Sequence, residues 1–210
     1  MLQTELVPSK NPNSRDLLIA LHGLGDSMEG YRWLPDVLKC PSVNVLLVNA
    51  PDAYYGGFAW YEYVLDRTVS APGVERSYRV LESLLNSTAE KGYPPDRTFL
   101  FGFSQGCLMC TETAVRYPRR LAGVIGVSGY IHDVQNLIKL ASPVAREQRF
   151  LITHGTDDPL ISLAEAKGDF DTLSSAGFHV DFHTFPKVHT IIEPEIPLFQ
   201  RFINERLGAA

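Results

Sequence analysis

The feature that most constrains the fold of this chain is an apolar run at residues 98–110 that is broken by a G-x-S-x-G motif at residues 102–106. Residues 98–101 are largely aromatic or aliphatic without alternation, which predicts a strand buried on both faces, as in the centre of a parallel sheet. The two glycines of the motif suit a tight turn from strand to helix, so a helix is expected to begin at Ser104. Such a turn would lift the Ser104 hydroxyl above the edge of the sheet, where it could act as a nucleophile.

Strands and helices are predicted to alternate along most of the chain. The pattern of apolar residues predicts strands at residues 4–7, 16–21, 43–48, 98–101, 121–128, 150–153 and 180–185. It predicts helices at residues 34–38, 74–91, 163–175 and 197–207, besides the one that follows Ser104. Alternation of this kind indicates an α/β fold with a mainly parallel central sheet and helices on both faces. No repeat or linker interrupts residues 1–210, so a single α/β domain is expected, and its length leaves little or no room for a cap domain.

Composition excludes several classes of protein. The net charge is −5, and Arg119-Arg120 is the only adjacent basic pair, so nucleic acid is not expected as a partner. No apolar run approaches the roughly 18 residues of a membrane span, and residues 1–10 lack the features of a signal peptide, so a cytoplasmic protein without stable membrane insertion is predicted. Cys40, Cys107 and Cys110 are an odd number of cysteines, which favours free, structural thiols.

A glycine-containing aromatic segment follows the third predicted strand. It is predicted to be a loop at residues 52–67, and so many aromatic side chains are expected to cover another part of the molecule. They are Tyr54, Tyr55, Phe58, Trp60, Tyr61 and Tyr63.

Polar residues that could carry out nucleophilic catalysis follow several predicted strands, at the sheet edge where ligands bind in open parallel sheets. Ser104, Asp158 and His189 occur in the chain order of α/β hydrolases. A serine hydroxyl needs an imidazole to accept its proton, and the resulting imidazolium needs a carboxylate to orient and stabilise it. Of the six histidines, only His189 lies on a loop directly after the last strand. Asp157 and, more weakly, Asp26 are alternatives to Asp158.

Two backbone N–H groups are expected to stabilise the oxyanion. The first belongs to Gln105, at the start of the predicted helix, and the second to the glycine-rich turn after residue 21, where Leu24 lies between two glycines. His22 and His154 each precede a glycine at the end of a strand, and a role in stabilising these turns is favoured for them over catalysis.

In these residues and their order, the sequence resembles the phospholipase/carboxylesterase family of α/β hydrolases. This family includes acyl-protein thioesterases and small bacterial carboxylesterases. The resemblance covers nearly the whole chain and rests on several motifs in order: residues 21–26, 49–51, Gly57 with Trp60 and Tyr61, 102–106, 154–159 and the late His189. It implies an α/β-hydrolase fold, and it implies Asp158 instead of Asp157 as the catalytic carboxylate. It also implies Leu24 and Gln105 as oxyanion donors and places Trp60 and Tyr61 beside the substrate's acyl group.

The sequence departs from the family pattern at four positions. Cys107 stands where the family often has glycine, and it could crowd the helix after Ser104. Val188 replaces the usual glycine before His189, Ser162 stands where proline is common, and Glu62 stands where aspartate is common. These differences bear on the substrate more than on the class of reaction.

The expected function is that of a serine carboxylesterase or thioesterase, which hydrolyses a small acyl ester or thioester through an acyl-enzyme intermediate without a cofactor or metal. Two alternatives remain: another serine hydrolase with the same triad, such as a lysophospholipase or peptidase, and a non-catalytic binding protein on a hydrolase scaffold. The sequence leaves the acyl-chain length, the choice between ester and thioester, and the oligomeric state open.

Overall fold

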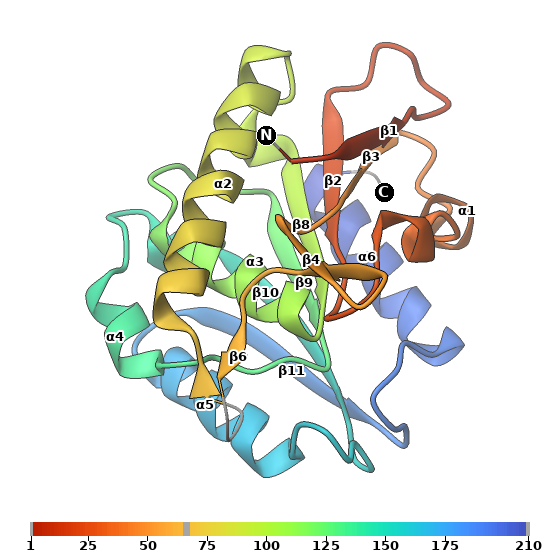
Figure 1. Cartoon of the computed structure of the whole chain (residues 1–210). Coiled ribbons are helices and arrows are strands. Elements are labelled where there is room, and N and C mark those ends of the chain that lie inside the picture. The colour runs from red at the N-terminus through yellow and green to blue at the C-terminus, as the bar shows by residue number, and fades with distance from the viewer. Residues whose placement is uncertain (1, 65–67, 209–210) are drawn as a thin grey trace.

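A seven-stranded sheet forms the centre of the molecule. The computed structural model describes residues 2–64 and 68–208, and its central strands are ordered β1-β3-β2-β8-β9-β10-β11 (Figure 1). All neighbouring pairs are parallel except β1 with β3. The bounds are β1 Thr4–Val7, β2 Asp16–Leu21, β3 Val43–Val48, β8 Thr98–Phe103, β9 Gly123–Val127, β10 Arg149–Gly155 and β11 His179–Phe185. The prediction of a mainly parallel sheet is therefore confirmed.

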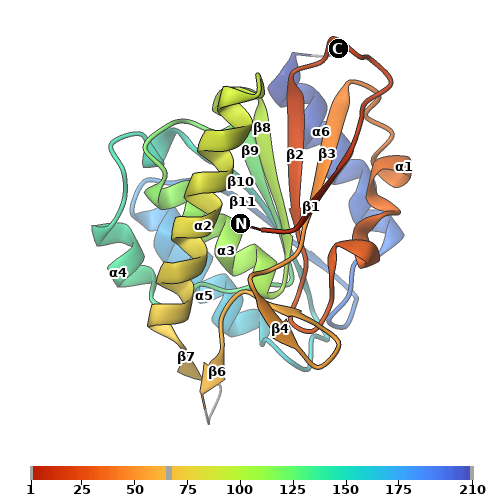
Figure 2. The same cartoon turned by 45° about the horizontal axis from the view of Figure 1, so that its top comes forward.

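Helices cover both faces of this sheet, as predicted, and Figure 2 shows the two layers on either side of the strands. One layer contains α2 (Ala71–Glu90), α3 (Gln105–Arg116), α4 (Val134–Lys139) and α5 (Leu163–Ser175), and the other contains α1 (Leu34–Leu38) and α6 (Ile196–Leu207). Because side chains alternate along a strand, Leu17 and Ile19 pack toward the first layer, whereas Leu18 and Ala20 pack toward the second. Short 3₁₀ turns are η1 (Met28–Tyr31), η3 (Pro95–Arg97), η4 (Ala145–Glu147) and η5 (Glu193–Glu195).

Some boundaries differ from the predicted ones for local reasons. Helix α2 begins three residues earlier than predicted because the Ser70 side chain accepts a hydrogen bond from the Gly73 N–H and Pro72 suits the first turn. Helix α4, of six residues, was not predicted; it begins after Asp133, whose side chain accepts a hydrogen bond from the Asn136 N–H. Strand β9 is shorter than predicted and β10 is longer.

The predicted aromatic loop at residues 52–67 contains strands, so that prediction is corrected for the described residues. β4 (Asp52–Tyr54) pairs with β5 (Gly57–Ala59), and β6 (Tyr63–Val64) pairs with β7 (Thr68–Val69). The β4–β5 turn consists of Tyr55 (φ 43°) and Gly56 (φ 89°), the two positive φ angles that a two-residue hairpin turn requires. Residues 65–67 of the predicted loop lie outside the described residues.

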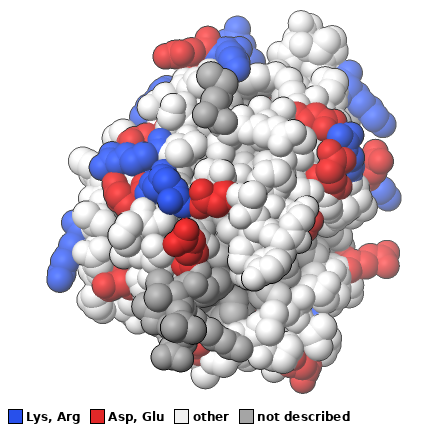
Figure 3. Space-filling model, in the orientation of Figure 1, with Lys and Arg blue, Asp and Glu red and all other residues white. Residues whose placement is uncertain are grey.

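Charged side chains on the face shown in Figure 3 lie in mixed groups of both signs, without a large area of one sign. Helix α2 carries exposed ion pairs, such as Arg79 with Glu75. Among the described residues, none of the helices is both long enough and apolar enough to cross a membrane.

Candidate active site

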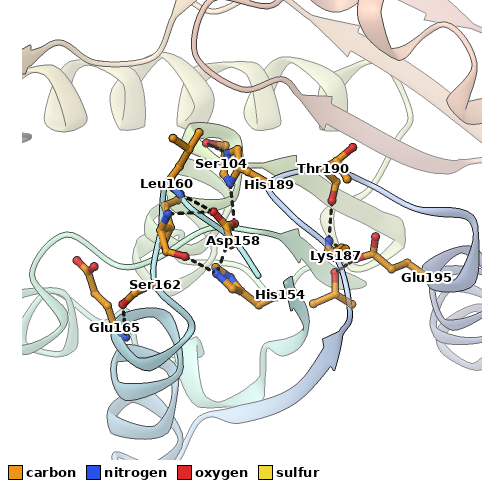
Figure 4. A network of polar contacts seen from close by, with 12 residues as sticks. Ser104, His154, Asp158, Leu160, Ser162, Glu165, Lys187, His189, Thr190 and Glu195 are labelled. Carbon is orange, nitrogen blue, oxygen red and sulfur yellow. Dashed lines mark hydrogen bonds and ion pairs between the residues drawn. The ribbon is translucent and has the colours of Figure 1, made fainter. Parts of the chain in front are cut away.

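Three side chains from separate loops meet at the carboxyl edge of the sheet (Figure 4). Ser104 follows β8, Asp158 lies shortly after β10, and His189 follows β11. The Nε2 atom of His189 lies 3.0 Å from Ser104 Oγ, and its Nδ1 atom lies 2.7 Å from Asp158 Oδ2. The imidazole can therefore accept a proton from the hydroxyl on one side while it donates an N–H bond to the carboxylate on the other.

The turn that carries Ser104 depends on both of its flanking glycines. Ser104 has φ 54° and ψ −117°, a conformation that costs a non-glycine residue free energy and holds the side chain out of the turn. A Cβ on Gly102 would lie 2.2 Å from Gly106 O, and a Cβ on Gly106 would lie 2.1 Å from Leu21 O. Both positions therefore exclude any side chain, which explains the G-x-S-x-G spacing in terms of contact.

Asp158 is held as a carboxylate by donors from its own loop. Burial opposes its ionisation, but hydrogen bonds from the Ile161 N–H, from His189 and from the Leu160 N–H outweigh burial and lower the pKa of the carboxyl below its ordinary value. Asp157, the alternative from sequence, accepts a bond from the Thr156 hydroxyl at an exposed position instead. The structure thus brings Asp158, and not Asp157, to His189.

The buried side chain of His154 contacts the loop that carries Asp158. Its Nε2 atom lies 3.0 Å from Ile161 O and 3.6 Å from Asp158 Oδ2. Burial lowers the pKa of this imidazole, so it is neutral and donates its Nε2–H to Ile161. This contact gives His154 the turn-stabilising position that the sequence suggested. The ring of His189 itself packs against Phe103, with centroids 4.8 Å apart.

The two predicted oxyanion donors belong to the start of α3 and to the turn after β2. Gln105 is the first residue of α3, where its N–H has no acceptor from an earlier turn. In the turn after β2, the Gly25 N–H bonds to Phe58 O and the Asp26 N–H to Gly23 O, whereas the Leu24 N–H has no acceptor within the described residues. Leu24 lines the cavity beside Ser104, and Gln105 directly follows Ser104 in the chain.

His22 fixes the shape of the turn that contains Leu24. Its Nδ1 lies 2.7 Å from Gly23 O, and its Nε2 accepts a bond from the Ala50 N–H at 3.0 Å. Burial lowers the pKa of His22, in agreement with a neutral ring that donates at one nitrogen and accepts at the other.

Trp60 and Tyr61 lie behind the residues that line the cavity, and the Tyr61 hydroxyl is 3.4 Å from that of Tyr130, which is one of them. Both are fully buried and neither lines the cavity beside Ser104. The indole Nε1–H of Trp60 donates to His22 O, and the Gln105 side-chain amide bonds to both Trp60 N and Tyr61 O. These two aromatic residues therefore support the turn after β2 and the start of α3.

A cavity of about 560 Å³ opens beside Ser104. Its apolar walls include residues that the sequence did not single out, although Leu160 and Ile161 follow Asp158 so closely that their position could have been inferred. Among the described residues that line it, Asp26 and Glu165 carry charge and neither Lys nor Arg occurs. The lining consists of Gly23, Leu24, Asp26, Phe103, Ser104, Tyr130, Leu160, Ile161, Glu165 and His189. Within residues 2–64 and 68–208, no group of three or more His, Cys, Asp or Glu side chains is arranged to hold a metal ion.

Comparison with known proteins identifies the relatives of this chain. Residues 2–207 match the sequence profile of the phospholipase/carboxylesterase family. Acyl-protein thioesterase 1 of Debaryomyces hansenii is 28% identical over 214 residues, which cover 92% of each chain, and that of Schizosaccharomyces pombe is 32% identical over 154 residues, or 69% of each chain. The solved structure of esterase PE8 superposes with a TM-score of 0.88 at 26% identity and covers 97% of this chain and 98% of that one. The predicted α/β-hydrolase fold is therefore confirmed.

Proposed function

The chain belongs to the phospholipase/carboxylesterase family, whose members are carboxylic ester hydrolases, and on that premise we propose that it hydrolyses acyl esters or thioesters with Ser104 as nucleophile, His189 as general base and acid, and Asp158 as the orienting carboxylate. The observation that carries this proposal is the position of His189, within hydrogen-bond distance of both Ser104 and Asp158. The names of the thioesterase and esterase relatives support the same class of reaction.

The proposed reaction has two halves. Ser104 Oγ attacks the acyl carbonyl while its proton passes to His189 Nε2, and the negative charge on the carbonyl oxygen is stabilised by the N–H groups of Leu24 and Gln105. Asp158 stabilises the imidazolium, which then gives its proton to the departing alcohol or thiol as the bond to the leaving group breaks. Water then attacks the acyl-serine as it loses a proton to His189, and His189 gives this proton to Ser104 Oγ as the bond to the acyl group breaks, which releases the carboxylic acid and restores the Ser104 hydroxyl.

The size and lining of the cavity support an apolar acyl group in this reaction. Phe103, Leu160 and Ile161 provide apolar surface next to the nucleophile. Burial of each methylene of an acyl chain is worth roughly 0.8 kcal/mol. We therefore propose that kcat/KM rises with acyl length until the chain fills the cavity.

Replacement of the nucleophile tests the proposal. Ser104→Ala is expected to lower kcat for p-nitrophenyl esters by roughly 10⁴- to 10⁶-fold, and to abolish stoichiometric labelling by a fluorophosphonate probe. Ser174→Ala, at an exposed position on α5, is the matched control and should retain both activities. Substantial hydrolysis by a correctly folded Ser104→Ala variant would refute the proposed function.

A further inference from the structure

Lys187 and Glu195, on either side of His189 in the chain, form a buried ion pair. The side chain of Lys187 is 1% exposed and that of Glu195 is 0% exposed, and Lys187 Nζ lies 2.6 Å from Glu195 Oε1. Glu195 also accepts hydrogen bonds from the Thr153 hydroxyl at 2.5 Å and from the Ile192 N–H at 2.7 Å. Charged groups are costly to bury, so a pair with this many specific partners calls for an explanation.

The pair ties together the loop that carries His189. The Lys187 ammonium donates to Glu195 and also to Thr190 O, at 2.8 Å (Figure 4). One side chain therefore connects the two ends of the short segment 187–190 that contains His189. Glu195 lies in η5 at the start of α6 and its Thr153 partner lies in β10. The loop is thereby fixed both to the sheet and to a helix.

The backbone of Lys187 makes a second connection, to the loop that carries Asp158. Its carbonyl oxygen accepts the Asp157 N–H at 3.2 Å. A Cβ at Gly155 would lie 2.2 Å from this same oxygen, so the two loops approach as closely as a glycine allows. Lys187 thus contacts both segments that bring a carboxylate and an imidazole to Ser104.

We propose that Lys187 is a positioning residue for the reaction, whose ammonium group, held by Glu195, fixes the 187–190 loop so that His189 stays aligned between Ser104 and Asp158. This inference rests on the proposed function of His189 as general base. Its physical basis is that proton transfer requires the imidazole within hydrogen-bond distance of both partners, and a displacement of about 1 Å can lower the rate about 100-fold.

Removal of either charge tests the inference. Lys187→Met keeps the length of the side chain and removes both hydrogen bonds of the ammonium group, and Glu195→Gln removes the charge that holds it. Each is expected to lower kcat and the rate of fluorophosphonate labelling about ten- to 100-fold at 25 °C, with KM unchanged within about twofold. Lys167→Met, at an exposed ion pair on α5, is the matched control and should retain wild-type kcat.

The double variant Lys187→Met/Glu195→Gln separates positioning from simple stability. It contains no unpaired buried charge, so its thermal midpoint should rise above that of either single variant. It still lacks the donor to Thr190 O, so its kcat should stay low. Recovery of kcat together with stability, or wild-type kcat in the folded single variants, would overturn the inference. If a single variant does not fold, the double variant supplies the same measurement.

Ser104→Ala in the same assays distinguishes a failure of the proposed function from a failure of the positioning role alone. If that variant keeps its activity, the proposed function fails. If it is inactive while the Lys187 variants have wild-type kcat, only the positioning role is lost.

Discussion

Cys107 lies where α3 packs against β9 and the residues after it, and two glycines make room for its side chain. A Cβ added at Gly126 would lie 2.6 Å from Cys107 Sγ, and one added at Gly129 would lie 2.4 Å from both Cys107 Cβ and Sγ. The thiol is fully buried, and burial raises its pKa to about 12, so it is a neutral packing group. The crowding that the sequence suggested at this position is thus absorbed by β9 and the residues after it.

A double-mutant cycle tests this packing. Gly129→Ala is expected to lower the free energy of unfolding by about 1–3 kcal/mol, because the new methyl group overlaps Cys107. In a Cys107→Gly background the same change should cost less than about 1 kcal/mol, since the overlapping atoms are gone. Urea unfolding of the four proteins measures the coupling. Equal costs in both backgrounds would show that Cys107 is not the group that Gly129 accommodates.

At the scale of single residues, the sequence indicated which polar residues lie at the edge of the sheet more clearly than it indicated how aromatic residues pack. Ser104, Asp158 and His189 each come after a strand of the parallel sheet, and such positions meet at one edge whatever the side chains between them do, although only the family resemblance selected Asp158 over Asp157. Trp60 and Tyr61 had no comparable constraint. An aromatic residue near a site has the same sequence signal whether it lines a cavity or supports a turn, so the hydrogen bond from Trp60 to His22 O could not be inferred from the sequence.

Among the elements, the β4–β5 hairpin has a direct connection to the oxyanion turn. The carbonyl oxygen of Phe58 on β5 accepts the Gly25 N–H, and the Phe58 N–H donates to Asp26 O, both at 2.9 Å. A Cβ at Gly57 would lie 2.1 Å from Gly25 O. The hairpin therefore acts as a support that fixes the Leu24 N–H, the proposed oxyanion donor.

Gly57→Ala is expected to displace the oxyanion turn and lower kcat by more than about tenfold, with a smaller effect on KM, because the oxyanion develops only in the transition state. Gly56→Ala is a matched control: the residue has φ 89°, so alanine is strained there, but its Cβ would meet no atom within 4 Å. The control should lose about 1 kcal/mol of stability and keep its kcat. Similar kcat values for the two variants would argue against a role for the hairpin in catalysis.

Helices α2 and α3 meet at a charge cluster whose protonation changes near neutral pH. Burial raises the pKa of Glu112 to about 7, although Arg116, whose nitrogen lies 3.6 Å away, opposes this rise. Arg116 also pairs with Glu75 and lies 3.7 Å from the centre of the Tyr78 ring. The carboxyl group therefore holds its proton in the folded state at pH values where it is ionised in the unfolded chain.

This shift predicts a pH dependence of stability. Between the ordinary pKa of 4.5 and about 7 the folded state binds more protons than the unfolded state, so the contribution of Glu112 to the free energy of unfolding falls as the pH rises through that window. The total change is about 3 kcal/mol. Glu112→Gln mimics the protonated form, so it should match the wild type at pH 5 and be more stable at pH 8 in urea unfolding. A difference independent of pH would contradict this assignment.

The elements themselves were largely predictable, and length explains part of where prediction ended. The long strands and helices of the central layers show buried runs or a helical period over six or more residues. The strands of the two small hairpins have two or three residues each, so no period can be recognised in them; α4, with six residues, was missed although α1, with five, was predicted. Their structure is set by turn geometry and by contacts with the rest of the chain.

Across the whole molecule, negative charge predominates both in the composition and at the candidate site. The chain has a net charge of −5. Of the described residues that line the cavity beside Ser104, Asp26 and Glu165 carry negative charge. A negatively charged substrate therefore approaches through an unfavourable potential, which salt weakens because it screens exposed charges.

A pair of esters that differ in charge measures this effect. The kcat/KM for p-nitrophenyl hemisuccinate should be about three- to tenfold lower than for p-nitrophenyl butyrate, and 0.5 M NaCl should narrow the ratio. Glu165→Gln should narrow the ratio at low salt, because it removes one of the two carboxylates at the cavity. Glu147→Gln changes the net charge equally but lies just before β10, at the opposite edge of the sheet, and should leave the ratio unchanged. If both variants narrow the ratio of kcat/KM equally, the net charge of the molecule causes the difference between the two esters. We expect that only Glu165→Gln narrows it, because salt screens charges over roughly 10 Å and the local field at the nucleophile then dominates.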